Sequence, residues 1–200
     1  MKKKAFEREL PPGYREIYSL DAKNSKLGVW MNAVGLLLSA AVLVPAFFWL
    51  RPDRAGSAPG IWFWLALLAV NLAYVVLHEL VHGAAYKLLT GEKLTFGISF
   101  TVSFCGVPNI YSTRKTALIS LLAPFTVFTL VFGLPLFFVQ DLWTRCFFAL
   151  MLSIHVGGCV GDLYDTALYL FRFRDPRTLM RDTGPAQFFY VPEGAPSKEE

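Results

Sequence analysis

Four long apolar stretches, separated by polar segments, dominate the pattern of this 200-residue chain. They run over Leu27–Leu50, Ile61–Leu89, Ala117–Val139 and Leu142–Phe171. About twenty consecutive apolar residues are enough for a helix to cross a bilayer. The pattern therefore predicts an all-α polytopic membrane protein with four transmembrane helices.

The segment between the second and third predicted helices has a different period. From Leu94 to Phe104, apolar residues alternate with Thr, Gly and Ser, which predicts a strand with one apolar face. We expect a small β-ribbon at about residues 93–112, bent or folded back at Gly97 and turned again after Gly106. Unpaired strand edges cannot face lipid hydrocarbon, so we expect this ribbon at the cytoplasmic interface or in a protein-lined cleft. There it either rests on the bilayer or binds substrate.

Polar segments flank the apolar region at both ends and set the expected boundaries. Residues 1–25 form an N-terminal cytoplasmic segment, 26–172 a four-helix membrane domain that includes the ribbon, and 173–200 a cytoplasmic tail. Within the tail, residues 187–191 read Gln-Phe-Phe-Tyr-Val, which predicts a short strand that pairs with the ribbon.

The basic residues indicate the orientation of the helices better than the net charge of +4 does. They cluster before the first helix, between the second and third, and after the fourth, whereas the other two loops carry only Arg51, Arg54 and Arg145. The positive-inside rule then predicts a multi-pass protein of the cell membrane with both termini and the middle loop in the cytoplasm. This explanation makes a nucleic-acid partner unnecessary. The expected partners are the lipid bilayer and a membrane-protein or peptide substrate.

The second apolar stretch contains the sequence His78-Glu79-Leu80-Val81-His82. Ionisable side chains cost several kcal/mol in hydrocarbon, so they rarely occur there without a partner or a role. On a helix, residues four apart lie on one face, and two imidazoles at this spacing can hold one zinc ion. Glu79, beside the first histidine, is then the expected general base for a water that zinc activates.

A catalytic zinc site usually has three protein ligands, so the fourth stretch must supply one more. Asp162 is the predicted third ligand because it lies at the depth of the two histidines, whereas Asp165 lies one turn deeper and His155 lies shallower. Asp165 and His155 remain alternatives for this role. His155 and Asn71 are expected either to support the site or to make structural hydrogen bonds within the membrane.

A resemblance to a known family rests on His78-Glu79-Leu80-Val81-His82-Gly83 and the later pair Gly161-Asp162. Over roughly residues 10–190 the layout resembles a bacterial membrane family labelled putative zincin peptidases. It is also similar to the site-2-protease-like intramembrane zinc metalloproteases, although here Leu163 follows the aspartate and no Asn-Pro precedes it. The resemblance implies a zinc peptidase.

The predicted function is that of a membrane-embedded zinc metallopeptidase that hydrolyses a peptide bond in or near a membrane segment. One alternative is a catalytically inactive membrane protein that binds a client helix and keeps a structural metal. The other is a metal transporter, which the lack of repeated halves in the sequence disfavours.

Overall fold

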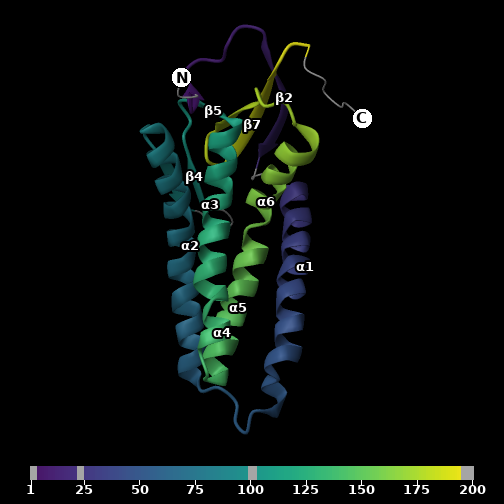
Figure 1. Cartoon of the computed structure of the whole chain (residues 1–200), viewed down its shortest axis with the longest axis vertical. Helices are drawn as coiled ribbons and strands as arrows, with labels where there is room; N and C mark the ends of the chain where they lie inside the picture. The colour runs from purple at the N-terminus through teal and green to yellow at the C-terminus, as the bar shows by residue number, and fades with distance from the viewer. Residues whose placement is uncertain (1–3, 22–24, 99–102, 195–200) are drawn as a thin grey trace. The chain divides into compact units, whose positions relative to one another are not determined.

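The computed structural model describes residues 4–21, 25–98 and 103–194, and 62% of the chain is helical. The mostly helical class is therefore confirmed. The helices are α1 (Ser25–Leu50), η1 (Pro52–Arg54), α2 (Ile61–Thr90), α3 (Arg114–Gly133), α4 (Pro135–Phe138), α5 (Leu142–Gly158), α6 (Val160–Ala167) and η2 (Leu168–Arg172). The strands are β1 (Phe6–Glu7), β2 (Tyr14–Asp21), β3 (Thr95–Ile98), β4 (Ser103–Gly106), β5 (Tyr111–Thr113), β6 (Leu179–Asp182) and β7 (Ala186–Pro192) (Figure 1).

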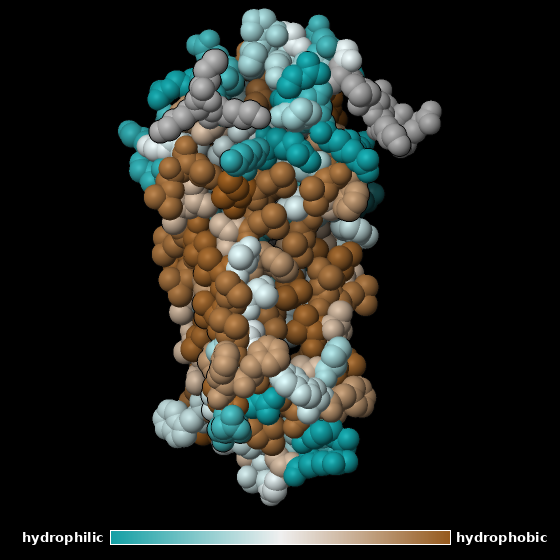
Figure 2. Space-filling view, in the orientation of Figure 1, coloured by the Kyte–Doolittle hydropathy of each residue, from teal (hydrophilic) through white to brown (hydrophobic). Residues whose placement is uncertain are grey.

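Among the described residues, three helices are long and apolar enough to cross a membrane, at Lys26–Arg54, Ile61–Thr90 and Arg114–Phe138. The predicted fourth span is broken at Cys159 into α5 and the helix that follows, so the number is four only if this pair counts as one span. Large apolar side chains are exposed on these helices: Trp62 is 79% exposed and Leu36 is 74% exposed. Figure 2 shows hydrophobic residues over most of the visible helical surface (Figure 2). Large exposed apolar surfaces of this kind are typical of proteins that contact a membrane.

The chain divides into two compact units. The first, called here the sheet unit, comprises Met1–Gly28, His78–Pro124 and Asp162–Glu200. The second, called the helical unit, comprises Val29–Leu77 and Phe125–Gly161.

The sheet unit contains a five-stranded antiparallel sheet in the order β1-β5-β6-β7-β2. Its core joins the sheet to α3 and η2 through Ala117, Leu121, Leu168, Tyr169, Phe173, Met180 and Phe189. This sheet goes beyond the prediction, which placed strands only in the ribbon and at residues 187–191. The reason is a register shift in β2 between Glu16 and Tyr18, which interrupts the apolar–polar alternation by which a strand is recognised.

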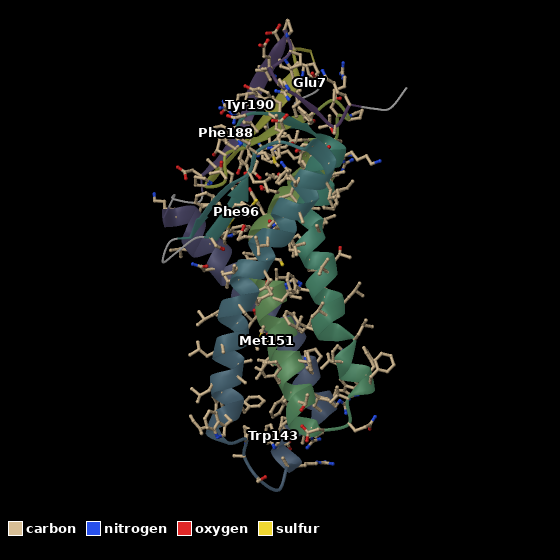
Figure 3. All side chains as sticks on the ribbon, turned by 90° about the vertical axis from the view of Figure 1, so that its left-hand side faces the viewer. Glu7, Phe96, Trp143, Met151, Phe188 and Tyr190 are labelled. Carbon is tan, nitrogen blue, oxygen red and sulfur yellow. The ribbon has the colours of Figure 1, made fainter. Side chains whose placement is uncertain are left out.

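The predicted ribbon is present as a separate two-stranded sheet in which β3 pairs with β4, from Thr95 opposite Gly106 to Ile98 opposite Ser103. The expected reversal at Gly97 is wrong, because Gly97 lies within β3. Strand β3 continues through Gly97 to Ile98, and residues 99–102 lie outside the described part of the chain. The predicted pairing of residues 187–191 with the ribbon is also wrong. Strand β7, which carries Phe188 and Tyr190, pairs with β2 and β6 instead (Figure 3).

Candidate metal centre

The two histidines of the motif meet one carboxylate within the sheet unit. His78 and His82 are one helical turn apart on α2, and their rings lie 4.9 Å apart between centroids. The Nε2 atom of His78 is 3.2 Å from Oδ2 of Asp162, and the Nε2 atom of His82 is 3.3 Å from Oδ1 of the same residue. One ligand atom from each of the three residues lies within 4.8 Å of the other two.

The three side chains have the proximity and the chemistry to hold one metal ion. The donors are two imidazole nitrogens and one carboxylate oxygen, which is a donor set typical of catalytic zinc. All three side chains are largely buried, so water can satisfy their polar atoms only in part. A metal ion bound by all three would satisfy them together.

The orientation of His82 is set by helix α3. Its Nδ1 donates a hydrogen bond of 2.8 Å to the backbone oxygen of Ser120. That oxygen is available because the residue four positions on is Pro124, which lies inside α3 and has no N–H to donate within the helix. With its proton on Nδ1, neutral His82 presents an unprotonated Nε2 towards Asp162, which is the form that binds a metal.

Glu79 is buried and is held by the ribbon. Its Oε1 accepts a hydrogen bond of 2.8 Å from Oγ of Ser103, the first residue of β4. The same strand carries Cys105. Burial raises the pKa of its thiol to about 12, and the nearby carboxylates of Asp182 and Glu79 contribute to this increase. The Cys105 thiol therefore stays protonated and is a weak metal ligand.

Gly83 explains how the ribbon comes close to the motif. A Cβ atom at this position would lie 2.7 Å from Cζ of Phe96 and 3.1 Å from Cδ1 of Leu94. Glycine therefore lets the Phe96 ring of β3 pack directly against the turn of α2 that follows His82. The sequence motif thus includes a residue whose role is clearance for the strand.

One turn beyond His82, Tyr86 continues the same face of α2. Its hydroxyl donates to Oδ2 of the buried Asp182 at 2.9 Å, and the backbone N–H of Gly184 donates to Oδ1 at 2.9 Å. Burial raises the pKa of Asp182 to about 6 even though both hydrogen bonds lower it. The sequence did not single out Ser103, Ser120 or Asp182. For the contact between Tyr86 and Asp182, the sequence signal was the position of Tyr86 four residues after His82.

The other residues singled out from the sequence lie elsewhere. Asp165 is buried and one of its carboxylate oxygens has no hydrogen-bond partner among the described residues, but it is not part of the three-ligand group. Asn71 belongs to the helical unit, where its buried Oδ1 also has no such partner. Neither observation tests the roles predicted for these residues.

His155 lies in the helical unit and is fully buried. Its Nδ1 is 2.8 Å from the Tyr74 hydroxyl, and its Nε2 is 3.2 Å from the backbone oxygen of Phe125 and 3.3 Å from the Thr129 hydroxyl. The rings of Tyr74, Phe125, Phe128 and Phe132 all lie within 6.1 Å of the imidazole, centroid to centroid. This environment favours the hydrogen-bonded, structural interpretation of His155.

Comparison with known proteins adds one finding. No curated protein and no solved structure matches the chain. Residues 71–176, just over half of the chain, match a family model described as "Putative zincin peptidase". The match includes the His78–His82 motif and Asp162. The chain therefore belongs to the family described as putative zincin peptidases.

Proposed function

We propose that this protein is a membrane-embedded zinc metallopeptidase that hydrolyses a peptide bond in or beside a membrane segment of its substrate. The family supports a metallopeptidase. The observation that carries the proposal is the meeting of two imidazole Nε2 atoms from α2 with the two oxygens of one largely buried carboxylate from α6.

In this proposal His78, His82 and Asp162 hold the zinc. When bound, zinc polarises the scissile carbonyl and lowers the pKa of a coordinated water towards about 7. The carbonyl of Ser120 keeps the His82 ring in the binding orientation and tautomer. Contacts of this kind are worth about 10–100-fold in metal affinity.

Glu79 acts as the general base. It takes the proton of the attacking water and passes it to the leaving amine, so that the amine departs uncharged. The hydrogen bond from Ser103 restricts the rotamers of Glu79, which makes Ser103 a positioning residue. Because Ser103 belongs to the ribbon, movement of β4 would displace the base.

The membrane setting rests on the three long apolar helices, whose side chains are largely exposed. The clusters of basic residues support an orientation with both termini and the segment between α2 and α3 in the cytoplasm. A reporter that is active only in the cytoplasm, fused after Glu200, should therefore be active. Activity of a periplasm-specific reporter at the same position would contradict this orientation.

The decisive experiment compares wild type with Glu79→Gln, using purified protein, a membrane-helix substrate panel and a parallel measurement of zinc per chain. The variant should keep its zinc, because Glu79 is not a ligand, and should lose about 10²–10⁴-fold in cleavage rate. The exposed Glu9→Gln serves as the matched control and should cleave at the wild-type rate. Cleavage by Glu79→Gln at the wild-type rate would contradict the proposed mechanism.

A further inference from the structure

The helical unit contains an apolar cavity of about 330 Å³. None of its lining residues belongs to the candidate metal centre, which lies in the sheet unit. It is formed by the last turns of α1, the first turn of α2 and the first half of α5. Its walls include Leu43, Ala46, Leu50, Phe63, Cys146 and Ala149, and they expose no polar surface. Its volume is at the lower end of the range for small-molecule sites, roughly 300–1,000 Å³.

The walls decide what kind of molecule can fill this cavity. Water needs two or more polar partners to be stable in a cavity, and these walls supply none. A peptide would bring backbone N–H and C=O groups that could not be satisfied there. A hydrocarbon chain needs no such partners, and apolar cavities of only about 150 Å³ already bind apolar molecules.

The location of the cavity favours a hydrocarbon chain that belongs to a lipid. Both α1 and α2 are long and apolar enough to span a membrane, and the cavity lies where their ends meet the loop between them. Trp64 and Trp143 belong to its lining, and Trp143 lies at the start of α5, as Figure 3 shows (Figure 3). Tryptophan is enriched at the level of lipid headgroups, so this end of the helical unit is expected at that depth.

One arginine next to the cavity walls is available to supply positive charge. Arg51 follows Leu50 in the sequence, but its guanidinium forms two hydrogen bonds with the carboxylate of Asp53. Arg145 precedes the lining residue Cys146 and bonds to Leu136, which packs against the lining residues Leu50, Cys146 and Ala149. The Arg145 guanidinium lies 4.7 Å from the centre of the Trp49 ring, and its Nε donates to the backbone oxygen of Leu136 at 3.1 Å. It is thus held in place, and a guanidinium is well suited to recognise phosphate.

We propose that this cavity binds one acyl chain of a membrane phospholipid, with the phosphate of that lipid at Arg145. The apolar walls accept the chain, and the guanidinium of Arg145 complements the charge of the phosphate. The site is independent of the zinc ligands, so it does not depend on the proposed peptidase activity.

The test uses the whole protein in phosphatidylcholine vesicles that contain a phosphatidylcholine with a photoactivatable diazirine near the end of one acyl chain. After irradiation, cross-links are mapped by mass spectrometry. In wild type they should concentrate on the cavity walls in α1 and α5, including Ala46 and Ala149. In Ala46→Trp, which fills the cavity, cross-linking of these segments should fall at least several-fold.

The matched control is Ala40→Trp, an exposed position on the same helix, which should keep the wild-type cross-linking pattern. Native mass spectrometry of the same samples should find one retained phospholipid per chain in wild type and less in Arg145→Gln. Cross-links spread evenly over the exposed helix surface of wild type would overturn the proposal. So would a pattern that Ala46→Trp leaves unchanged, or phospholipid retention that Arg145→Gln does not reduce.

Discussion

Two buried histidines, one in each unit, have different surroundings. His155 in the helical unit has protein groups at both ring nitrogens and four aromatic rings around it. His82 in the sheet unit has one nitrogen fixed by a carbonyl and the other directed at a carboxylate that also faces His78. Burial alone therefore does not separate a proposed metal ligand from a structural histidine. The two histidines differ instead in the partner of the second ring nitrogen, which is a protein group for His155 and the shared carboxylate of Asp162 for His82.

The largest expected effect is the loss of zinc affinity when a proposed ligand is removed. His78→Ala, His82→Ala and Asp162→Asn should each lower zinc affinity by more than about 100-fold, because each removes a proposed ligand, whereas outer hydrogen bonds are worth about 10–100-fold. His155→Ala should retain zinc, because both ring nitrogens of His155 contact protein groups. Zinc per chain, measured by elemental mass spectrometry on folded samples, checks both. Loss of zinc in His155→Ala together with its retention in Asp162→Asn would reverse the assignment.

A smaller effect is expected where helices of the helical unit are in close contact. Ser39 and Ser153 exchange two hydrogen bonds with each other's backbone oxygens, at 2.9 Å each, and a Cβ on Gly157 would overlap Ser39 and the Gly35 carbonyl. Gly157→Ala should therefore cost about 1–3 kcal/mol through overpacking. Thermal unfolding in detergent should show a lower midpoint for this variant. Gly161→Ala, with nothing within 4 Å of the new atom, is the control and should not lower the midpoint.

The smallest expected effect concerns Ser103. Ser103→Ala removes the hydrogen bond to Glu79 and should lower kcat roughly tenfold, which is the lower limit of the effect expected from a hydrogen bond to a charged group worth about 1.5–3 kcal/mol. KM and zinc content should stay near wild type. Ser103→Thr keeps the hydroxyl and should restore most of the rate, while the exposed Ser19→Ala should change nothing. Equal rates for Ser103→Ala and wild type would remove the positioning role.

The parts of the site that the sequence could predict are those set by local spacing. The i, i+4 relation of His78 and His82 is fixed by the helix, and helix depth pointed to Asp162. The hydroxyl of Ser103 and the carbonyl of Ser120 come from other elements, and no periodicity links them to α2. Pro124 does imply a carbonyl without a helical donor at Ser120, but the sequence does not name the group that uses it.

The fold could be predicted where elements are long. The apolar helices are 25 to 30 residues long, so a few polar residues within them do not obscure the apolar pattern. Strands β1 and β5 have two and three residues, too few for alternation to show, and β2 contains a register shift. The helical class was therefore predictable, whereas the five-stranded sheet, which combines both ends of the chain with β5 from its middle, was not.

The sheet unit is assembled from three separated parts of the chain, and this has a consequence for the order of events during synthesis. Tyr14 pairs with Pro192, and His78 meets Asp162 across 84 positions. A nascent chain therefore emerges with its histidines long before the carboxylate that faces them and the strand that closes the sheet. The three proposed ligands therefore cannot come together until most of the protein has left the ribosome, so an incomplete chain lacks the proposed metal site.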